Sequence, residues 1–236
     1  MNYRFDKAII IALGGSIMYP DNIDFRFLKK FRKFIKRSTG RNRKFIIIVA
    51  GGGRLSRIYQ HAASKITKLT NYDKDWLGIH ATRSNAHLLR TIFRETADQV
   101  VIDERGRIKK LRYPITIASG WRPGWSTDYI AAALAVDFKV SEIIIAGKPA
   151  YVYDKDPNTK RGKKVMDAKP FKKLSWAHYR RMIPRKWVPG AHAPVDPVGA
   201  KLAQEKGIKA IVINGKNLKN FENLLRGDKF RGTIIG

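Results

Sequence analysis

Runs of branched apolar residues alternate along the chain with segments whose apolar residues recur every three or four positions. Nearly continuous apolar runs occur at Ala8–Leu13, Phe45–Val49 and Glu142–Ala146, a pattern typical of strands buried on both faces of a parallel sheet. Shorter strands are expected at Gln99–Ile102, Ile115–Ala118, Lys209–Ile213 and Gly232–Ile235.

The helical periodicity is clearest after Asp24, which we expect to cap a helix reaching about Arg37. Further helices are expected from the glycine run at 51–53 to Ile66, from Asp73 or Asp75 to Arg94, and at Thr127–Phe138, Ser175–Met182, Pro197–Lys206 and Leu218–Arg226, with a short hairpin within Lys148–Pro170. Alternating strands and helices predict right-handed βαβ units and an α/β fold whose mostly parallel sheet is covered on both faces.

The size and composition favour a single globular domain. The chain has 236 residues, 44% of them hydrophobic, and no shift in composition marks a linker. Its longest apolar run, Tyr129–Val136, is too short to cross a bilayer, and no signal peptide is visible. Without cysteine there is neither a disulfide nor a cysteine-zinc site, and the five histidines show no metal-ligand spacing beyond the loose separation of His80 and His87. We therefore expect a cytoplasmic enzyme with no metal-binding side-chain cluster and no membrane partner.

The charge is the unusual part of the composition. Lysine and arginine number 48 against 19 acidic residues, which gives a net charge of +29. Such an excess favours anionic partners, namely nucleotides, nucleic acid or anionic lipid. The basic residues are spread widely, with clusters at Lys29–Lys30, Arg32–Lys33, Lys36–Arg37, Arg41–Lys44, Lys160–Lys164 and Arg180–Lys186. A solvated basic surface explains this distribution, a dedicated nucleic-acid function is the alternative, and non-specific adhesion to nucleic acid is expected either way.

Two predicted strands end in glycine-rich loops, ALGGSI and VAGGGRLSR. Ligands of open α/β sheets bind beyond the carboxyl ends of the strands. Glycine lets backbone N–H groups approach an anion, and the helix that follows each loop adds a positive dipole end. Either loop alone could be only a tight turn. Together, and with Arg54 and Arg57 after the second, they predict a phosphate site in which Arg57 can fork onto phosphate oxygens.

A third loop, SGWRPGWSTD at 119–128, leads into a predicted helix. Ser126, Thr127 and Asp128 could serve as plain helix caps or could bind phosphate and order the active site. Trp121 and Trp125 could stack on a base or pack the loop. No loop matches GxxxxGK[ST], which excludes a P-loop enzyme, and a Rossmann dinucleotide site is disfavoured because neither glycine loop fits GxGxxG.

The order of the motifs resembles the archaeal-type uridylate kinases of the amino-acid-kinase family. The matching segments are GGS, GGGxxxR, DWLGIHATRSNAHLL, PGWSTD, VYDKDP, DPVGAKLA and a terminal GTII, spread over residues 7–235. The resemblance implies a three-layer αβα sandwich in which 1–140 form a phosphate-acceptor lobe and 141–236 an ATP lobe. It also implies transfer of the γ-phosphoryl group of ATP to UMP with Mg²⁺.

The resemblance also implies roles for individual residues. Gly14, Gly15 and Ser16 would cradle the transferring phosphates, with Asp128, Asp196 and Lys201 at the catalytic centre. UMP would be bound by Gly52, Gly53, Arg57, Asp75, Trp121 and Thr127. ATP would be bound by Lys148, Tyr153, Asp156 and Pro157.

Three positions depart from the pattern of this family. Ala12 stands where the bacterial branch has a lysine, which makes Lys201 the leading catalytic cation. Ala150 replaces an expected acid, for which Lys148 could compensate, and Trp121 replaces a small polar residue at the uracil. Two alternatives therefore stay open: an enzyme of this fold acting on another small acceptor, or a non-catalytic nucleotide- or RNA-binding member.

Relatives of this type form homohexamers. The helix after the first glycine loop usually builds the dimer contact, so Phe27, Phe31 and Phe34 are expected at an interface as an alternative to the core.

Overall fold

The computed structural model describes residues 3–5, 8–40, 45–155, 168–187 and 193–236. One large sheet runs through the molecule in the strand order β3-β4-β2-β1-β5-β9-β10-β8. Its strands are β1 (Ala8–Leu13), β2 (Phe45–Ala50), β3 (Ala97–Ile102), β4 (Ile115–Ala118), β5 (Glu142–Gly147), β8 (Lys173–Leu174), β9 (Lys209–Asn214) and β10 (Thr233–Ile235). All neighbouring strands are parallel except β9 and β10, so the prediction of a mostly parallel sheet is confirmed.

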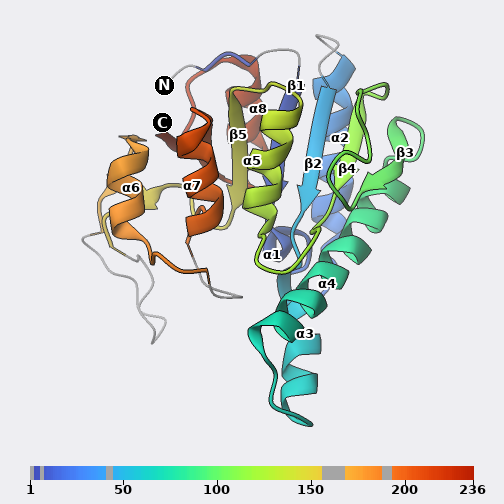
Figure 1. The fold of residues 1–236 in the computed structure, drawn as a ribbon. Coiled ribbons are helices and arrows are strands. Elements are labelled where there is room, and N and C mark those ends of the chain that lie inside the picture. The colour runs from blue at the N-terminus through green and yellow to red at the C-terminus, as the bar shows by residue number, and fades with distance from the viewer. Residues whose placement is uncertain (1–2, 6–7, 41–44, 156–167, 188–192) are drawn as a thin grey trace.

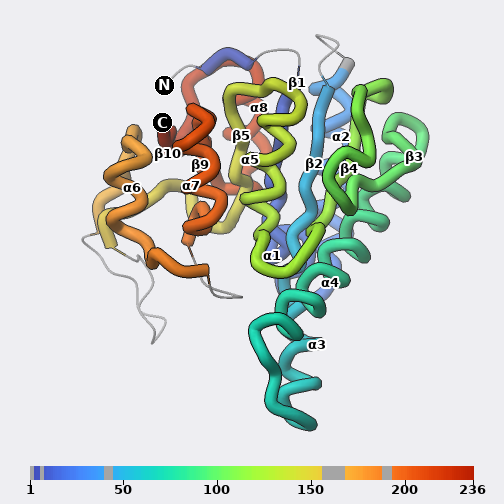
Figure 2. The backbone as a smooth tube through the Cα atoms, viewed as in Figure 1, coloured from blue at the N-terminus to red at the C-terminus, as the bar shows by residue number. Residues whose placement is uncertain are grey.

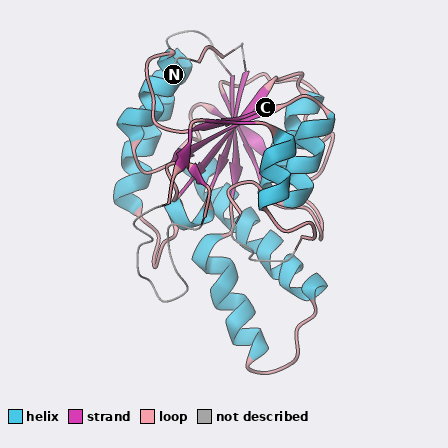
Figure 3. Ribbon diagram, turned by 90° about the vertical axis from the view of Figure 1, so that its left-hand side faces the viewer, coloured by secondary structure: helices cyan, strands magenta, loops and turns pink. Residues whose placement is uncertain are grey.

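Helices cover both faces of the sheet and give the three layers that Figure 1 shows. The helices are α1 (Gly15–Met18), α2 (Phe25–Gly40), α3 (Gly53–Ser64), α4 (Asn71–Ile92), α5 (Thr127–Asp137), α6 (Trp176–Met182), α7 (Pro197–Glu205) and α8 (Leu218–Arg226). One apolar core joins α1, α2, α4 and α8 to the sheet, and a second joins α5, α6 and α7 to its other face. The sheet is seen almost end-on between these two helical layers in Figure 3.

A small antiparallel pair lies outside the main sheet. β6 (Val152–Tyr153) pairs with β7 (Pro170–Phe171), as the predicted hairpin requires. Val152 N–H donates to the Thr233 hydroxyl at 2.9 Å and so ties this pair to the last strand of the sheet.

The sequence located most elements but missed two short ones, α1 and β8, which contain four and two residues. It also misplaced the start of α4. The N-cap is Thr70, whose hydroxyl accepts from Asp73 N–H while the Asp73 carboxylate accepts from Thr70 N–H. Asp73 is therefore the third residue of a capping box rather than the residue that opens the helix.

The phenylalanines of α2 belong to the core of the single chain. Phe27, Phe31 and Phe34 are 7%, 0% and 2% exposed, and they pack under the sheet with Phe221 and Phe93. Burial of this apolar face within the chain overturns the expectation that these rings form an intersubunit contact.

The hairpin of α3 and α4 projects beyond the edge of the sheet, as the backbone trace in Figure 2 makes clear. No residue of α3 is buried. The sheet itself is continuous across residue 140, because β5 pairs directly with β1. The division into an acceptor lobe and an ATP lobe stays a prediction. No helix in the described part of the chain is long and apolar enough to span a bilayer.

Candidate active site

The two glycine loops lie side by side because they follow neighbouring parallel strands. Leu13 and Ala50, the last residues of β1 and β2, are in register. Gly51 N–H donates to Leu13 C=O at 2.9 Å, and on the other side Gly14 N–H donates to Ala146 C=O at the end of β5 at 3.0 Å. The carboxyl ends of three adjacent strands therefore form the floor of the site, where open α/β sheets bind ligands.

Gly15 and Gly53 bring the two loops into backbone contact. A Cβ built on Gly15 would lie 2.1 Å from the Gly53 nitrogen, and Gly53 has φ +62°. Any side chain at Gly15 would therefore separate the loops, and Gly53 adopts a conformation that other residues rarely take. The predicted cradle residues Gly14, Gly15 and Ser16 thus adjoin the predicted UMP-phosphate residues Gly52 and Gly53.

The two arginines after the second loop differ in their partners. Arg54 is paired with Asp21 at 2.9 Å. The side chain of Arg57, one turn into α3, is exposed and forms no hydrogen bond or ion pair with another residue of the described ranges. Its guanidinium therefore has no partner in the described part of the chain, and its contact with a phosphate stays a prediction.

One face of α4 holds the second glycine loop and the third loop, which are called the acceptor loops below. The buried Asn85 amide donates to the carbonyl oxygens of Gly51 at 2.7 Å and Gly52 at 3.2 Å. The buried Thr82 hydroxyl accepts from Gly120 N–H at 2.7 Å. The Asp75 carboxylate accepts from Gly124 N–H at 2.7 Å. Asp75, predicted to hold the UMP ribose, thus fixes the third loop in this structure.

Asn85 and Thr82 are further residues of the candidate site, and the sequence alone indicated no role for them. Both lie in the segment DWLGIHATRSNAHLL that carried the resemblance. Thr82 and Asn85 follow Asp75 by seven and ten residues, which places the three side chains near one side of a helix. That spacing could have indicated a shared role for the three side chains. Only the fold shows that this side of α4 contacts the second glycine loop and the third loop.

Asp128 and Asp196 meet where the N-termini of α5 and α7 pack together. Asp196 N–H lies 3.4 Å from Asp128 Oδ2, and the Ser126 hydroxyl donates to Asp196 Oδ2. The helices approach closely at Gly199, where a Cβ would lie 2.8 Å from Asp196 Oδ2 and 3.0 Å from Tyr129 N. The fold thus places together two acids that are 68 residues apart, and their catalytic role stays a prediction.

The surroundings of this pair oppose ionisation. Burial, with a smaller contribution from the neighbouring Asp196 carboxylate, raises the pKa of Asp128 to about 8. Burial also raises the pKa of Asp196, although hydrogen bonds from Ser126, Gly199 and Val198 favour its charged form. A site that disfavours two negative charges in this way is one where a cation would stabilise both.

Both members of the pair also have structural roles. Asp196 is the N-cap of α7 and accepts from Val198 N–H at 2.8 Å and Gly199 N–H at 3.1 Å. Ser126 is the N-cap of α5, so the predicted capping role belongs to Ser126, while Thr127 is the first helical residue. The buried Tyr179 hydroxyl donates to Val195 C=O and accepts from Val195 N–H, both at 2.7 Å, which fixes the chain just before Asp196.

Lys201, the predicted catalytic cation, is five residues beyond Asp196 on α7. Its side chain is exposed, and its ammonium lies 3.8 Å from the Glu205 carboxylate one turn away. Such a contact between exposed groups holds a side chain weakly. The structure therefore leaves Lys201 free to move, and its catalytic role stays a prediction.

The predicted ATP residues are only partly described. Lys148 follows β5 and is exposed, and Tyr153 is a half-buried residue of β6 whose ring lies 6.2 Å from that of Tyr151. Asp156 and Pro157 lie outside the described residues. The carboxyl end of β5 adjoins Gly14, so the backbone that leads to Lys148 lies beside the first glycine loop. No hydrogen bond or ion pair between the Lys148 side chain and this loop is seen among the described residues.

The two tryptophans of the third loop occupy different environments. Trp121 is 5% exposed and its indole N–H donates to Ile102 C=O at 3.2 Å. This burial favours packing over the predicted uracil contact. Trp125 is only half-buried, with its ring 4.6 Å from that of Tyr129 and 4.2 Å from the Arg122 guanidinium carbon. Of the two, Trp125 has the more accessible face for a base.

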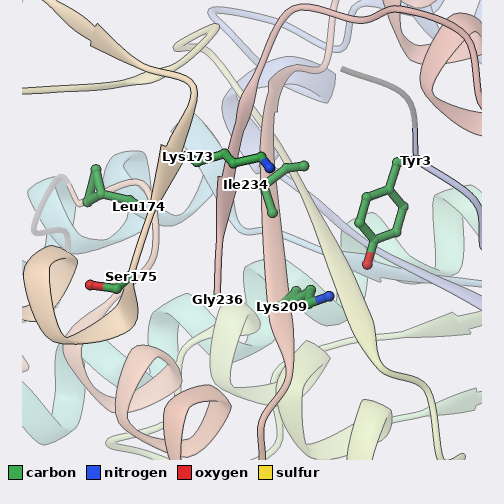
Figure 4. Close-up of a pocket in the computed structure, with 7 residues that line it drawn as sticks. All are labelled: Tyr3, Lys173, Leu174, Ser175, Lys209, Ile234 and Gly236. Carbon is green, nitrogen blue, oxygen red and sulfur yellow. The ribbon is translucent and has the colours of Figure 1, made fainter.

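A cavity of about 600 Å³ lies at the opposite end of the sheet, near the start of β9 and the end of β10 (Figure 4). It is lined by Tyr3, Lys173, Leu174, Ser175, Lys209, Ile234 and Gly236. None of the predicted site residues lies there, so this cavity is separate from the glycine loops.

The chain is similar to known proteins along almost its whole length. The sequence profile of the amino acid kinase family matches residues 7–214. A uridylate kinase of Staphylothermus marinus is 33% identical over 232 residues, which cover 97% of this chain and 98% of that protein. A uridylate kinase of Thermococcus sibiricus is 29% identical over 230 residues, covering 96% and 98%.

The fold comparison points the same way. The crystal structure of a uridylate kinase from Archaeoglobus fulgidus matches with a TM-score of 0.81 and 27% sequence identity, covering 98% of this chain and 100% of that one. The match therefore extends over almost the whole of both chains.

Proposed function

The chain belongs to the amino acid kinase family, and we propose that it is a uridylate kinase that transfers the terminal phosphoryl group of ATP to UMP. The products are UDP and ADP. The observation that carries the proposal is the contact between the glycine loops after β1 and β2, beside an Arg57 that has no ion-pair partner among the described residues. Two anionic phosphates can be held side by side there by backbone N–H groups.

The proposed division of labour follows the strand order. UMP is bound on the β2 and β4 side, with its phosphate at Gly52, Gly53, Arg57 and Thr127. ATP is bound on the β5 side, near Lys148 and Tyr153, with its phosphates over Gly14, Gly15 and Ser16. An oxygen of the UMP phosphate forms a bond to the γ-phosphorus of ATP as the bond to the bridging oxygen of ADP breaks. The attacking oxygen is already anionic, so positioning and charge neutralisation supply most of the catalysis.

The acid pair fits Mg²⁺. No cluster of three histidine, cysteine or acidic side chains occurs in the described ranges. Mg²⁺ commonly takes one or two protein carboxylates together with substrate phosphates and water, and Asp128 and Asp196 supply that number. An ion held there would neutralise charge on the transferring phosphoryl group. Its charge would also offset the burial that raises the pKa of Asp128.

A hydrogen bond anchors the segment after β5, in which Ala150 replaces the expected acid. Ala150 follows β5, and the neighbouring backbone is held because Lys148 C=O accepts from the Asn214 amide at 2.8 Å. The Lys148 side chain remains exposed and available to a phosphate. We propose that Lys148 contacts a phosphate of ATP and in this way compensates for the expected acid that Ala150 replaces.

The test is a coupled assay of ADP formation with nucleic-acid-free protein, ATP and Mg²⁺, across UMP, CMP, AMP, GMP and dTMP. We expect UMP to be the preferred acceptor, and Arg57→Ala to raise KM for UMP by about 10-fold or more because a charge-assisted contact is lost. Arg54→Ala is the matched control, since Arg54 is engaged by Asp21. ATP and UMP binding without turnover would instead favour a non-catalytic member of the family.

The predicted homohexamer and cytoplasmic location also stay proposals. Four exposed apolar side chains lie on the α3–α4 hairpin, at Ile58, Tyr59, Ile66 and Tyr72. We propose that copies of this chain meet there rather than through the phenylalanines of α2.

A further inference from the structure

The outward face of α2 carries five exposed cationic side chains, Arg26, Lys29, Lys30, Lys33 and Arg37. Their spacing of three or four residues places them along one side of the helix. None of them forms a salt bridge with another residue of the described ranges, and α2 contains no acidic residue. These five residues are called the α2 basic stripe below.

The stripe differs from the other cations of the same helix. Arg32 and Lys36 share Glu95, at 3.2 Å and 2.9 Å. The stripe has no such acid, although it contains like-charged pairs at i,i+4, including Arg26 with Lys30 and Lys29 with Lys33. Like charges at that spacing destabilise a helix. A ligand with negative charges repeated at about the 5.4 Å pitch of the helix would relieve this repulsion.

An exposed aromatic ring lies at the start of the stripe. Phe25 is 69% exposed, and the Arg26 guanidinium carbon lies 5.8 Å from its ring centre. Cations that follow a phosphate backbone, combined with an aromatic face for a base, are the two elements of single-stranded nucleic-acid binding. We propose that the α2 basic stripe and Phe25 bind single-stranded RNA, with phosphates on the stripe and a base stacked on Phe25.

Two other occupants fit this surface less well. An amphipathic helix binds a membrane by inserting its apolar face, and the apolar face of α2 is buried in the core. A second copy of the chain, related by a two-fold axis, would bring the same five cations opposite themselves. Charge repulsion opposes that contact, whereas RNA supplies the complementary charge.

The experiment measures binding of a fluorescent 20-nucleotide oligouridylate to purified full-length protein at several salt concentrations. The stripe variant replaces Arg26, Lys29, Lys30, Lys33 and Arg37 with glutamine, a good helix former. The control variant makes the same change at Lys172, Arg181, Arg185, Lys186 and Lys206, which are also exposed and also comprise two arginines and three lysines. Both variants therefore lose five charges.

We expect the stripe variant to weaken RNA binding on the order of 100-fold at about 0.1 M salt, and the control variant to weaken it far less. The slope of log K against log salt should fall by about 3.5 for the stripe variant, because each phosphate contact on a single strand contributes about 0.7. Phe25→Ala should weaken binding with no change in that slope. ADP formation should persist in all three variants, because none of the substituted residues belongs to the proposed site.

Three results would overturn the proposal. Equal losses in the stripe and control variants would show that net charge alone attracts RNA. An unchanged affinity in the stripe variant would exclude the surface. Binding of the stripe to phosphatidylserine vesicles, with equal or weaker binding to the oligouridylate, would assign it to a membrane.

Discussion

Because Gly15 and Gly53 are in backbone contact, a single methyl group added at Gly15 would disrupt the packing of the two glycine loops. A Cβ at Gly15 would meet backbone atoms at 2.1 Å and 2.6 Å, none of which can move without shifting a strand end. We expect Gly15→Ala to lower the free energy of unfolding by about 1–3 kcal/mol, the usual cost of overpacking, and to abolish most ADP formation.

Gly78→Ala is the control for that substitution. Gly78 lies within α4, where its nearest neighbour to an added Cβ is the Ser56 hydroxyl at 3.4 Å. Alanine there should be neutral or stabilise the protein by up to about 1 kcal/mol, because glycine is a poor helix former. Urea unfolding of both variants decides the matter, and a Gly15→Ala protein as stable as the wild type would contradict the close approach of the loops.

The acid pair predicts an unusual pH dependence for the ligand-free protein. Burial raises the folded-state pKa of Asp128 to about 8 from its ordinary value of 3.8, so the folded state binds more protons than the unfolded state between these values. The free energy of unfolding therefore falls as pH rises from about 4 to about 8. We expect the urea midpoint to decline across this window in wild type and to decline less in Asp128→Asn.

Asp73→Asn is the contrasting variant in the same measurement of the urea midpoint against pH. The Thr70 hydrogen bonds lower the pKa of Asp73, so its contribution is present above the unfolded pKa and is lost as pH falls below it. Its removal should leave the decline between pH 5 and 8 unchanged. A wild-type midpoint that rises throughout this window would mean that Asp128 is ionised in the free protein.

At the scale of elements, α4 acts as the support for both acceptor loops. Asn85→Ala would remove the donor shared by the Gly51 and Gly52 carbonyl oxygens. Leaving buried carbonyls unpaired costs about 1–3 kcal/mol, and the displaced loop should raise KM for UMP more than it lowers kcat. Thr91→Ala, on the exposed side of the same helix, removes only a hydrogen bond to His87 C=O and should change neither KM nor stability appreciably. Steady-state kinetics with unchanged KM in Asn85→Ala would contradict the supporting role.

The elements also show what the sequence could and could not predict. AIIIAL and FIIIVA are recognisable as buried strands because every residue is apolar. The glycines after them indicate where the site is expected. Two nearby aspartates, Asp73 and Asp75, were the expected helix starts, so Thr70 was not identified as the N-cap of α4. The helix α1 is too short to show a helical period. Burial of Trp121 and of the α2 phenylalanines depends on contacts between distant elements. Local periodicity identifies an apolar face without saying which surface covers it.

At the scale of the whole molecule, the α3–α4 hairpin is the surface at which we expect copies of the chain to meet. Ile58, Tyr59, Ile66 and Tyr72 are 43%, 57%, 87% and 60% exposed on one projecting hairpin. Single exposed apolar residues are ordinary, but a group on one element is typical of an interaction surface. We expect light scattering to give the mass of a homo-oligomer for wild type and a smaller mass for the double variant Ile58→Asp, Ile66→Asp.

The matched variant Val100→Asp, Tyr113→Asp changes the charge equally at exposed apolar residues elsewhere, 40% and 43% exposed, and should keep the wild-type mass. Because the same hairpin carries Arg57 and Asp75, contact between copies would also restrain the proposed UMP site. The hairpin variant should therefore show a higher KM for UMP as well as a smaller mass. A variant that retains full mass would place the contact on another surface, and one that dissociates with unchanged KM would show that each chain binds UMP independently.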